Sequence, residues 1–307
     1  MFAALTLFLV IAFSRAARAE NLTISPEAKA AMDKIYEGDP DAALQTARSL
    51  EQARPDHPEG YLLEAEAVWW KRYCAACEIK YGMVDAWKRE KDNDDIAYLA
   101  LIARVTALAE QQLAKSETAE MHVYAGMGWA LQARVYGLRE ENRNAARAAV
   151  KARAEMIRAL QIDPQMADAT AALGVYNYFV DTLPSIVKML RFFMGIPGGN
   201  KEQGIEQMRV GMDKGIILAV EARYILARNL RMYDHDYEQA LEVTEPLLAR
   251  YPRSPLFQLL AGNLNAEMGR NAQAAPFFQS ALQTSIPDTV CAARIREIAT
   301  AFLGTLH

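Results

Sequence analysis

The sequence predicts an all-α protein, a right-handed solenoid of stacked antiparallel helix pairs, and three observations predict it. First, long stretches such as residues 142–161 are rich in alanine and free of glycine and proline, which favours helix. Second, alternating runs of β-branched residues, the mark of strands, are nearly absent. Third, "LARNL" at residues 226–230 returns 34 residues later as "LAGNL". A period of this length is typical of helix pairs that bury their apolar faces only by stacking on neighbours.

The composition is that of an ordinary folded protein. The chain has 307 residues, of which 52% are apolar and 23% charged, so it can bury a substantial core. Its formal net charge of -4 gives no sequence-wide basic field and leaves room only for a local patch of lysine and arginine. We therefore expect no nucleic-acid partner.

The N-terminus predicts export. An apolar stretch over residues 2–13 is followed by Ala17-Arg18-Ala19, which satisfies the small-x-small rule for signal peptidase. The stretch is shorter than the roughly 20 residues that a membrane-spanning helix needs. We expect a signal peptide at residues 1–19 with cleavage near Ala19, and a mature domain at 20–307 in the periplasm or outside the cell. An uncleaved N-terminal anchor is the alternative.

The same repeat unit occurs near both ends of the chain. Residues 38–58 align without a gap on residues 235–255. Small side chains at Ala43, Ala240 and Ala274 let two helices approach closely. Proline cannot continue the helical hydrogen-bond ladder, so one proline in each unit should end a helix. These prolines are Pro55, Pro164 and Pro252.

A further copy lies in the middle of the chain. Trp129 and Tyr136 are seven residues apart on one helical face beside Ala133, and Ala152 precedes Pro164 by twelve residues, as Ala43 precedes Pro55. The pattern resembles the tetratricopeptide repeat. The resemblance covers residues 26–58, 120–168 and 218–290, whereas residues 63–119 keep helical periodicity without the repeat signature. It implies a scaffold whose concave face binds a protein or peptide.

An insert near residues 183–199 interrupts the repeats. A first repeat helix carrying Tyr176 and Tyr178 should end at Leu183-Pro184, before an apolar helix of about eleven residues. A glycine-rich turn follows, and Asn200 with Gln203 has the pattern of a capping box that begins the next helix. Three interpretations stay open for the insert: a plug packed on the superhelix, a wall of a groove for a partner, or a contact with a membrane surface. Residues 174–215 also resemble tetratricopeptide proteins of the mitochondrial outer membrane, the inclusion-body clearance type.

Two of the three cysteines form a C-x-x-C motif at Cys74 and Cys77. Residue 78 is glutamate, so the haem-attachment pattern fails, and no second pair supplies the remaining ligands of a zinc site. We expect a disulfide bond between Cys74 and Cys77 across one helical turn, with two reduced thiols as the alternative. Cys291 is expected to be a packed residue of the last helix.

These features predict an exported, non-enzymatic scaffold that binds a protein or peptide in the cell envelope. We expect no catalytic residues, metal or cofactor, because no nucleophile–base or metal-ligand motif occurs. The alternative is a protein that binds a hydrophobic ligand or a membrane surface through residues 184–199. The candidate contact residues are Tyr176, Tyr178, Ile186, Leu190, Phe193 and the repeated asparagines Asn229 and Asn263.

Overall fold

The computed structural model describes residues 22–76, 93–183 and 195–306. The expected signal peptide, Cys77 and three residues of the insert, Ile186, Leu190 and Phe193, lie outside these ranges. Within them the regular structure is helical and contains no strand, which confirms the predicted all-α class.

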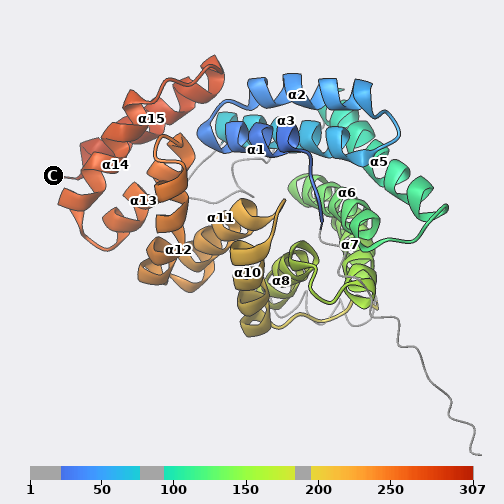
Figure 1. Ribbon diagram of the computed structural model, residues 1–307. Coiled ribbons are helices and arrows are strands. Elements are labelled where there is room, and N and C mark those ends of the chain that lie inside the picture. The colour runs from blue at the N-terminus through green and yellow to red at the C-terminus, as the bar shows by residue number, and fades with distance from the viewer. Residues whose placement is uncertain (1–21, 77–92, 184–194, 307) are drawn as a thin grey trace, which may run out of the picture.

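Consecutive helices form antiparallel pairs, and Figure 1 shows them following one another around an arc. The helices of the first half are α1 (Pro26–Glu37), α2 (Pro40–Ala53), α3 (Pro58–Ala76), α5 (Asn93–Leu113), α6 (Ala119–Leu138), α7 (Asn142–Ile162) and α8 (Ala167–Thr182). The second half comprises α10 (Lys201–Lys214), α11 (Ala219–Asn229), the short π-helix η1 (Leu230–Asp234), α12 (Tyr237–Arg250), α13 (Pro255–Glu267), α14 (Asn271–Gln283) and α15 (Thr289–Thr305). None of the helices in the described ranges is long and apolar enough to cross a membrane.

The helix ends follow the local signals in the sequence. Helices α2, α7 and α12 each stop two residues before the proline expected to end them. Helix α10 begins as expected, because the Asn200 side chain accepts a hydrogen bond of 2.7 Å from the backbone N–H of Gln203. These ends depend on residues within one turn, which explains why the sequence predicts them.

Small residues set the closest helix contacts. Ala43, Ala240 and Ala274 are fully buried, as the repeat pattern predicts. Helix α8 pairs with α10 at a glycine crossing, where a Cβ on Gly174 would lie 2.7 Å from the carbonyl oxygen of Gly204. Helix α10 is therefore the second helix of the pair that α8 begins, and the insert joins the two.

The two ends of the arc meet. Helix α15 packs against α3, and the C-terminal helices lie beside α1–α3 in Figure 1. The Asp33 carboxylate of α1 accepts a 2.5 Å hydrogen bond from the Tyr251 hydroxyl at the end of α12 and a 2.8 Å bond from Arg250. The stack of helix pairs is thus closed on itself.

Candidate functional site

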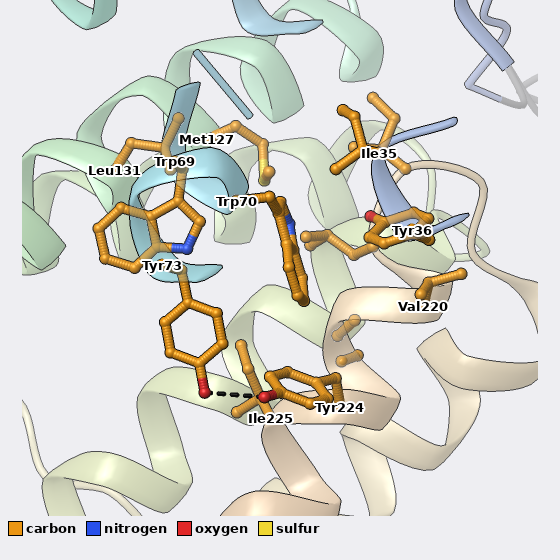
Figure 2. Packing of buried hydrophobic residues seen from close by; sticks show 14 of the residues in the cluster. Ile35, Tyr36, Trp69, Trp70, Tyr73, Met127, Leu131, Val220, Tyr224 and Ile225 are labelled. Carbon is orange, nitrogen blue, oxygen red and sulfur yellow. Dashed lines mark hydrogen bonds between the residues drawn. The ribbon is translucent and has the colours of Figure 1, made fainter. Parts of the chain in front are cut away.

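Six buried aromatic side chains, which we call the inner aromatic cluster, meet where α1 and α3 approach α11 and α13. They are Tyr36, Trp70, Tyr73, Tyr224, Tyr251 and Phe257. Each is at most 5% exposed, and the rings of Trp70 and Tyr224 lie 5.3 Å apart. Figure 2 shows the hydroxyl groups of Tyr73 and Tyr224 joined by a hydrogen bond, which is 2.7 Å long. The cluster joins α1 and α3 to α11 and α13.

A disulfide bond closes the same junction. It joins Cys74 of α3 to Cys291 of α15, with Cα atoms 5.1 Å apart and a sequence separation of 217 residues. The expected Cys74–Cys77 pairing is therefore wrong, since Cys74 is already bonded to Cys291. Cys291 is buried in the last helix as expected, but it is a cross-link as well as a packed residue. The local C-x-x-C spacing gave no sign of a partner that only the closed arc brings near.

Three charged side chains lie beside the aromatic rings. The Arg134 guanidinium of α6 donates to the Glu221 carboxylate of α11 and lies 4.5 Å from the centroid of Trp69. The neighbouring Glu66 is 4% exposed, and neither carboxyl oxygen has a hydrogen-bond partner in the described part of the chain. Burial raises the pKa of Glu66 to about 8, and the charge of Glu221 raises it further against the opposing effect of Arg134. Glu66 is therefore mostly protonated at neutral pH.

The two tyrosines predicted as partner contacts are packing residues in this structure. Tyr176 is 9% exposed, and its hydroxyl donates a 2.9 Å hydrogen bond to the carbonyl oxygen of Pro197. Tyr178 is fully buried and donates a 2.8 Å bond to the Asp234 carboxylate. Tyr176 holds α8 to the last residues of the insert, and Tyr178 holds it to η1.

The two repeated asparagines are also interior. Asn229 and Asn263 are 0% and 1% exposed, and the Asn263 side-chain oxygen accepts a hydrogen bond from Arg231. Neither amide lies on a surface that a partner reaches in this conformation. Their role in partner binding, like that of the two tyrosines and the three residues outside the described ranges, stays a prediction.

An open groove runs along the seam between α6 and α7. This α6/α7 groove has a volume of about 740 Å³ and is bounded on its far side by Gly195 and Ile196. The residues from α6 are Trp129, Gln132 and Tyr136, and those from α7 are Arg143, Asn144, Ala146, Arg147, Ala148, Val150 and Lys151. Trp129 and Tyr136, the aromatic pair of the repeat pattern, are both half-buried and line the α6 side of the groove.

The positive charge of the groove comes from one stripe of α7. Arg143, Arg147 and Lys151 follow one another at four-residue intervals, so they lie on one helical face, and all three are exposed. The Lys151 ammonium lies 3.8 Å from the ring centroid of Trp129. Within the described ranges, Arg143 and Arg147 have no hydrogen-bond or ion-pair partner, and no carboxylate lines the groove. A strongly positive groove therefore lies on a protein whose formal net charge is -4.

Comparisons with known proteins add two neighbours in fold. No protein-family model matches the chain. The structure is similar to TTC0263, a thermophilic TPR protein of Thermus thermophilus, at 12% identity and a TM-score of 0.32, covering 89% of this chain and 97% of that one. It is also similar to yeast Tom70, at 9% identity and a TM-score of 0.29, covering 91% of this chain and 88% of that one.

The helix pairs themselves identify the fold. They are antiparallel, α12 and α14 begin 34 residues apart, and a proline follows the second helix of three pairs. The chain is an all-α stack of antiparallel helix pairs, as the sequence predicted. The α6/α7 groove of this stack is a feature that sequence reasoning missed. The signal was present in the four-residue spacing of its cations, which the alanine-rich composition of α7 obscured.

A second cavity, of about 340 Å³, lies on the other side of α7. It is lined mainly by amide and glycine residues between α7, α8 and the start of α10. Two of its polar side chains are already engaged, since Asn177 donates a 2.7 Å hydrogen bond to Gln207 and the Arg153 guanidinium lies 5.6 Å from the ring centroid of Tyr176. The α6/α7 groove, with its unpaired cations, is the stronger candidate for binding.

Proposed function

We propose that the chain is an exported, non-enzymatic scaffold that holds a protein or peptide partner, and that the partner lies in the α6/α7 groove. The groove itself carries the proposal. Its cations are exposed and two of them lack partners in the described part, while its aromatic wall is half-buried. Such side chains favour recognition, because desolvated rings and arginines supply most of the binding energy at protein interfaces.

Two features support export. Residues 1–19 have the composition of a signal peptide, and the Cys74–Cys291 bond is of a kind that persists in oxidising compartments and is rare in the cytosol. We expect the mature protein to begin at Glu20 and to be recovered from the cell envelope or the medium. N-terminal sequencing of the native protein tests this. An intact N-terminus together with free thiols at Cys74 and Cys291 would contradict export.

The binding surface is tested by site-directed photo-crosslinking in the full chain. A benzophenone side chain at Val150, which lines the groove, should capture a discrete partner in cells that make the protein natively. Val210 of α10 is the matched control, because it is 39% exposed and does not line the groove. The same captured bands from both positions, or none from Val150, would overturn the assignment of the groove.

The membrane alternative has its own measurement. Flotation of the purified protein with vesicles that contain about 30% anionic lipid detects peripheral binding, which depends strongly on ionic strength. We expect the protein to remain unbound while crosslinking at Val150 succeeds. Vesicle binding without a captured partner would favour the alternative function.

A further inference from the structure

The spacing of charges in the α6/α7 groove specifies the chemistry of its partner. Cations four residues apart on a helix are separated along its axis by about 6 Å. In an extended peptide, alternate side chains point to one side and are separated by about 6.6 Å. The stripe of Arg143, Arg147 and Lys151 therefore matches carboxylates placed at every second residue of an extended chain.

The α6 side of the groove constrains the residues in between. Trp129 and Tyr136 of α6 line the groove together with Ile196, and they offer aromatic and aliphatic surface. Side chains that alternate with the carboxylates in an extended peptide point away from the stripe, toward the α6 side. We propose that the groove binds an extended segment of a partner protein in which acidic and apolar residues alternate. This inference rests on the proposed function and names the partner class of the same site.

Charge complementarity argues against the nearest competing occupant. Residues 184–194 of this chain adjoin the groove in sequence, and they contain Lys188 and Arg191 but no acidic residue. Placing them beside the stripe would add like charges instead of balancing Arg143 and Arg147. A partner that brings carboxylates pairs both guanidiniums, each of which donates two parallel N–H bonds to one carboxylate.

The test is a binding titration with a synthetic probe. A fluorescein-labelled peptide containing Glu-Val-Glu-Val-Glu is compared by fluorescence anisotropy with one of the same composition containing Glu-Glu-Glu-Val-Val. We expect the alternating peptide to bind at least about tenfold more tightly, and to lose affinity as NaCl rises from about 50 to about 500 mM. Equal affinity of the two peptides would overturn the claim that the groove prefers alternating acidic and apolar residues.

Charge-reversal variants assign the binding to the groove. Arg147→Glu should weaken the alternating peptide by about tenfold, and Arg143→Glu, as a second variant, by a similar factor. Arg209→Glu is the matched control, because Arg209 is exposed on α10 away from the groove, and it should change the affinity by less than about twofold. Circular dichroism melting confirms that each variant is folded. An unchanged affinity in folded Arg147→Glu and Arg143→Glu would overturn the proposal.

The crosslinking measurement separates this inference from the proposed function. If Val150 captures a partner and Arg147→Glu leaves the capture unchanged, the groove binds a partner but not through acidic residues, and only this inference fails. If Val150 captures nothing and neither peptide binds, both fail. Binding of anionic vesicles that is lost in Arg147→Glu, in the absence of peptide binding, would assign the stripe to a membrane surface and overturn the inference.

Discussion

The inner aromatic cluster and the α6/α7 groove both combine aromatic rings with charged side chains, but they differ in what surrounds those groups. In the cluster, every ring is buried and Arg134 is paired with Glu221. In the groove, Trp129 and Tyr136 are half-buried, and Arg143 and Arg147 have no partner in the described ranges. The same residue types thus stabilise the fold at one place and remain available for binding at the other.

Closure of the arc determines which aromatic and charged side chains are buried. Aromatic side chains of the protein itself join the two ends of the curved stack of helix pairs, and Figure 2 shows part of this packing. Burial of such side chains is strongly favourable, whereas exposed charges contribute little to stability. Substitutions in the cluster should therefore lower the free energy of unfolding, and substitutions in the groove should change it little.

The largest expected effect is the loss of the cross-link between the ends of the arc. The double variant Cys74→Ser/Cys291→Ser should lower the free energy of unfolding by about 4–5 kcal/mol, because the bond closes a very long loop in the unfolded chain. Urea unfolding monitored by circular dichroism measures it. Cys77→Ser is the control and should keep the bond. Recovery of a Cys74–Cys77 peptide from non-reducing digests would contradict the pairing.

Truncation of a ring should have the next largest effect. Tyr224→Ala should lower the free energy of unfolding by about 3–4 kcal/mol, because it leaves a cavity among Trp70, Tyr73 and Phe257. Tyr224→Phe keeps the ring and removes only the hydrogen bond to Tyr73, so it should cost about 1 kcal/mol. Equal losses in the two variants would mean that the ring itself contributes nothing to closure.

Local features of the fold were predictable from the sequence. The helix ends at Pro55, Pro164 and Pro252, the cap at Asn200 and the buried alanines depend on residues within a turn or on one repeat. The closure was not predictable, because the small crossing angle of each helix pair must accumulate around the whole arc before Cys74 meets Cys291.

The groove was predictable in part. The spacing of Arg143, Arg147 and Lys151 and the pair Trp129 and Tyr136 are visible in the sequence. Which face of α7 remains uncovered is set by how the neighbouring helices pack, and no single-sequence pattern records it. For the same reason the exposure of Asn229 and Asn263 could not be judged from their repetition, and the structure places both in the interior.

A pH titration of the free energy of unfolding isolates the contribution of Glu66, the buried carboxyl beside the inner aromatic cluster. The pKa of Glu66 is raised from 4.5 to about 8, so the folded state holds a proton that the unfolded state releases above pH 4.5. The free energy of unfolding should therefore fall as pH rises from about 5 to 8, by about 3 kcal/mol. Glu66→Gln should remove this component, so the variant should be the more stable protein at pH 8. The difference between the two proteins isolates Glu66, and a difference that does not change with pH would contradict its buried protonated state.

The smallest expected effect is an increase in the free energy of unfolding, whereas the cluster variants lower it. Arg147 lies four residues from both Arg143 and Lys151, and like charges at this spacing destabilise a helix by about 0.2–0.5 kcal/mol for each pair. Arg147→Gln removes both pairs and should therefore raise the free energy of unfolding by about 0.4–1.0 kcal/mol. The matched substitution Arg209→Gln should lower it slightly, because Arg209 lies three residues after Glu206 and four before Asp213. Replicate urea titrations at low salt measure the sign of each change in the free energy of unfolding. At about 0.5 M NaCl both changes should disappear, because salt screens exposed charges. A loss of stability in Arg147→Gln would mean that the guanidinium is already paired, and the groove would then be a packed surface like the cluster.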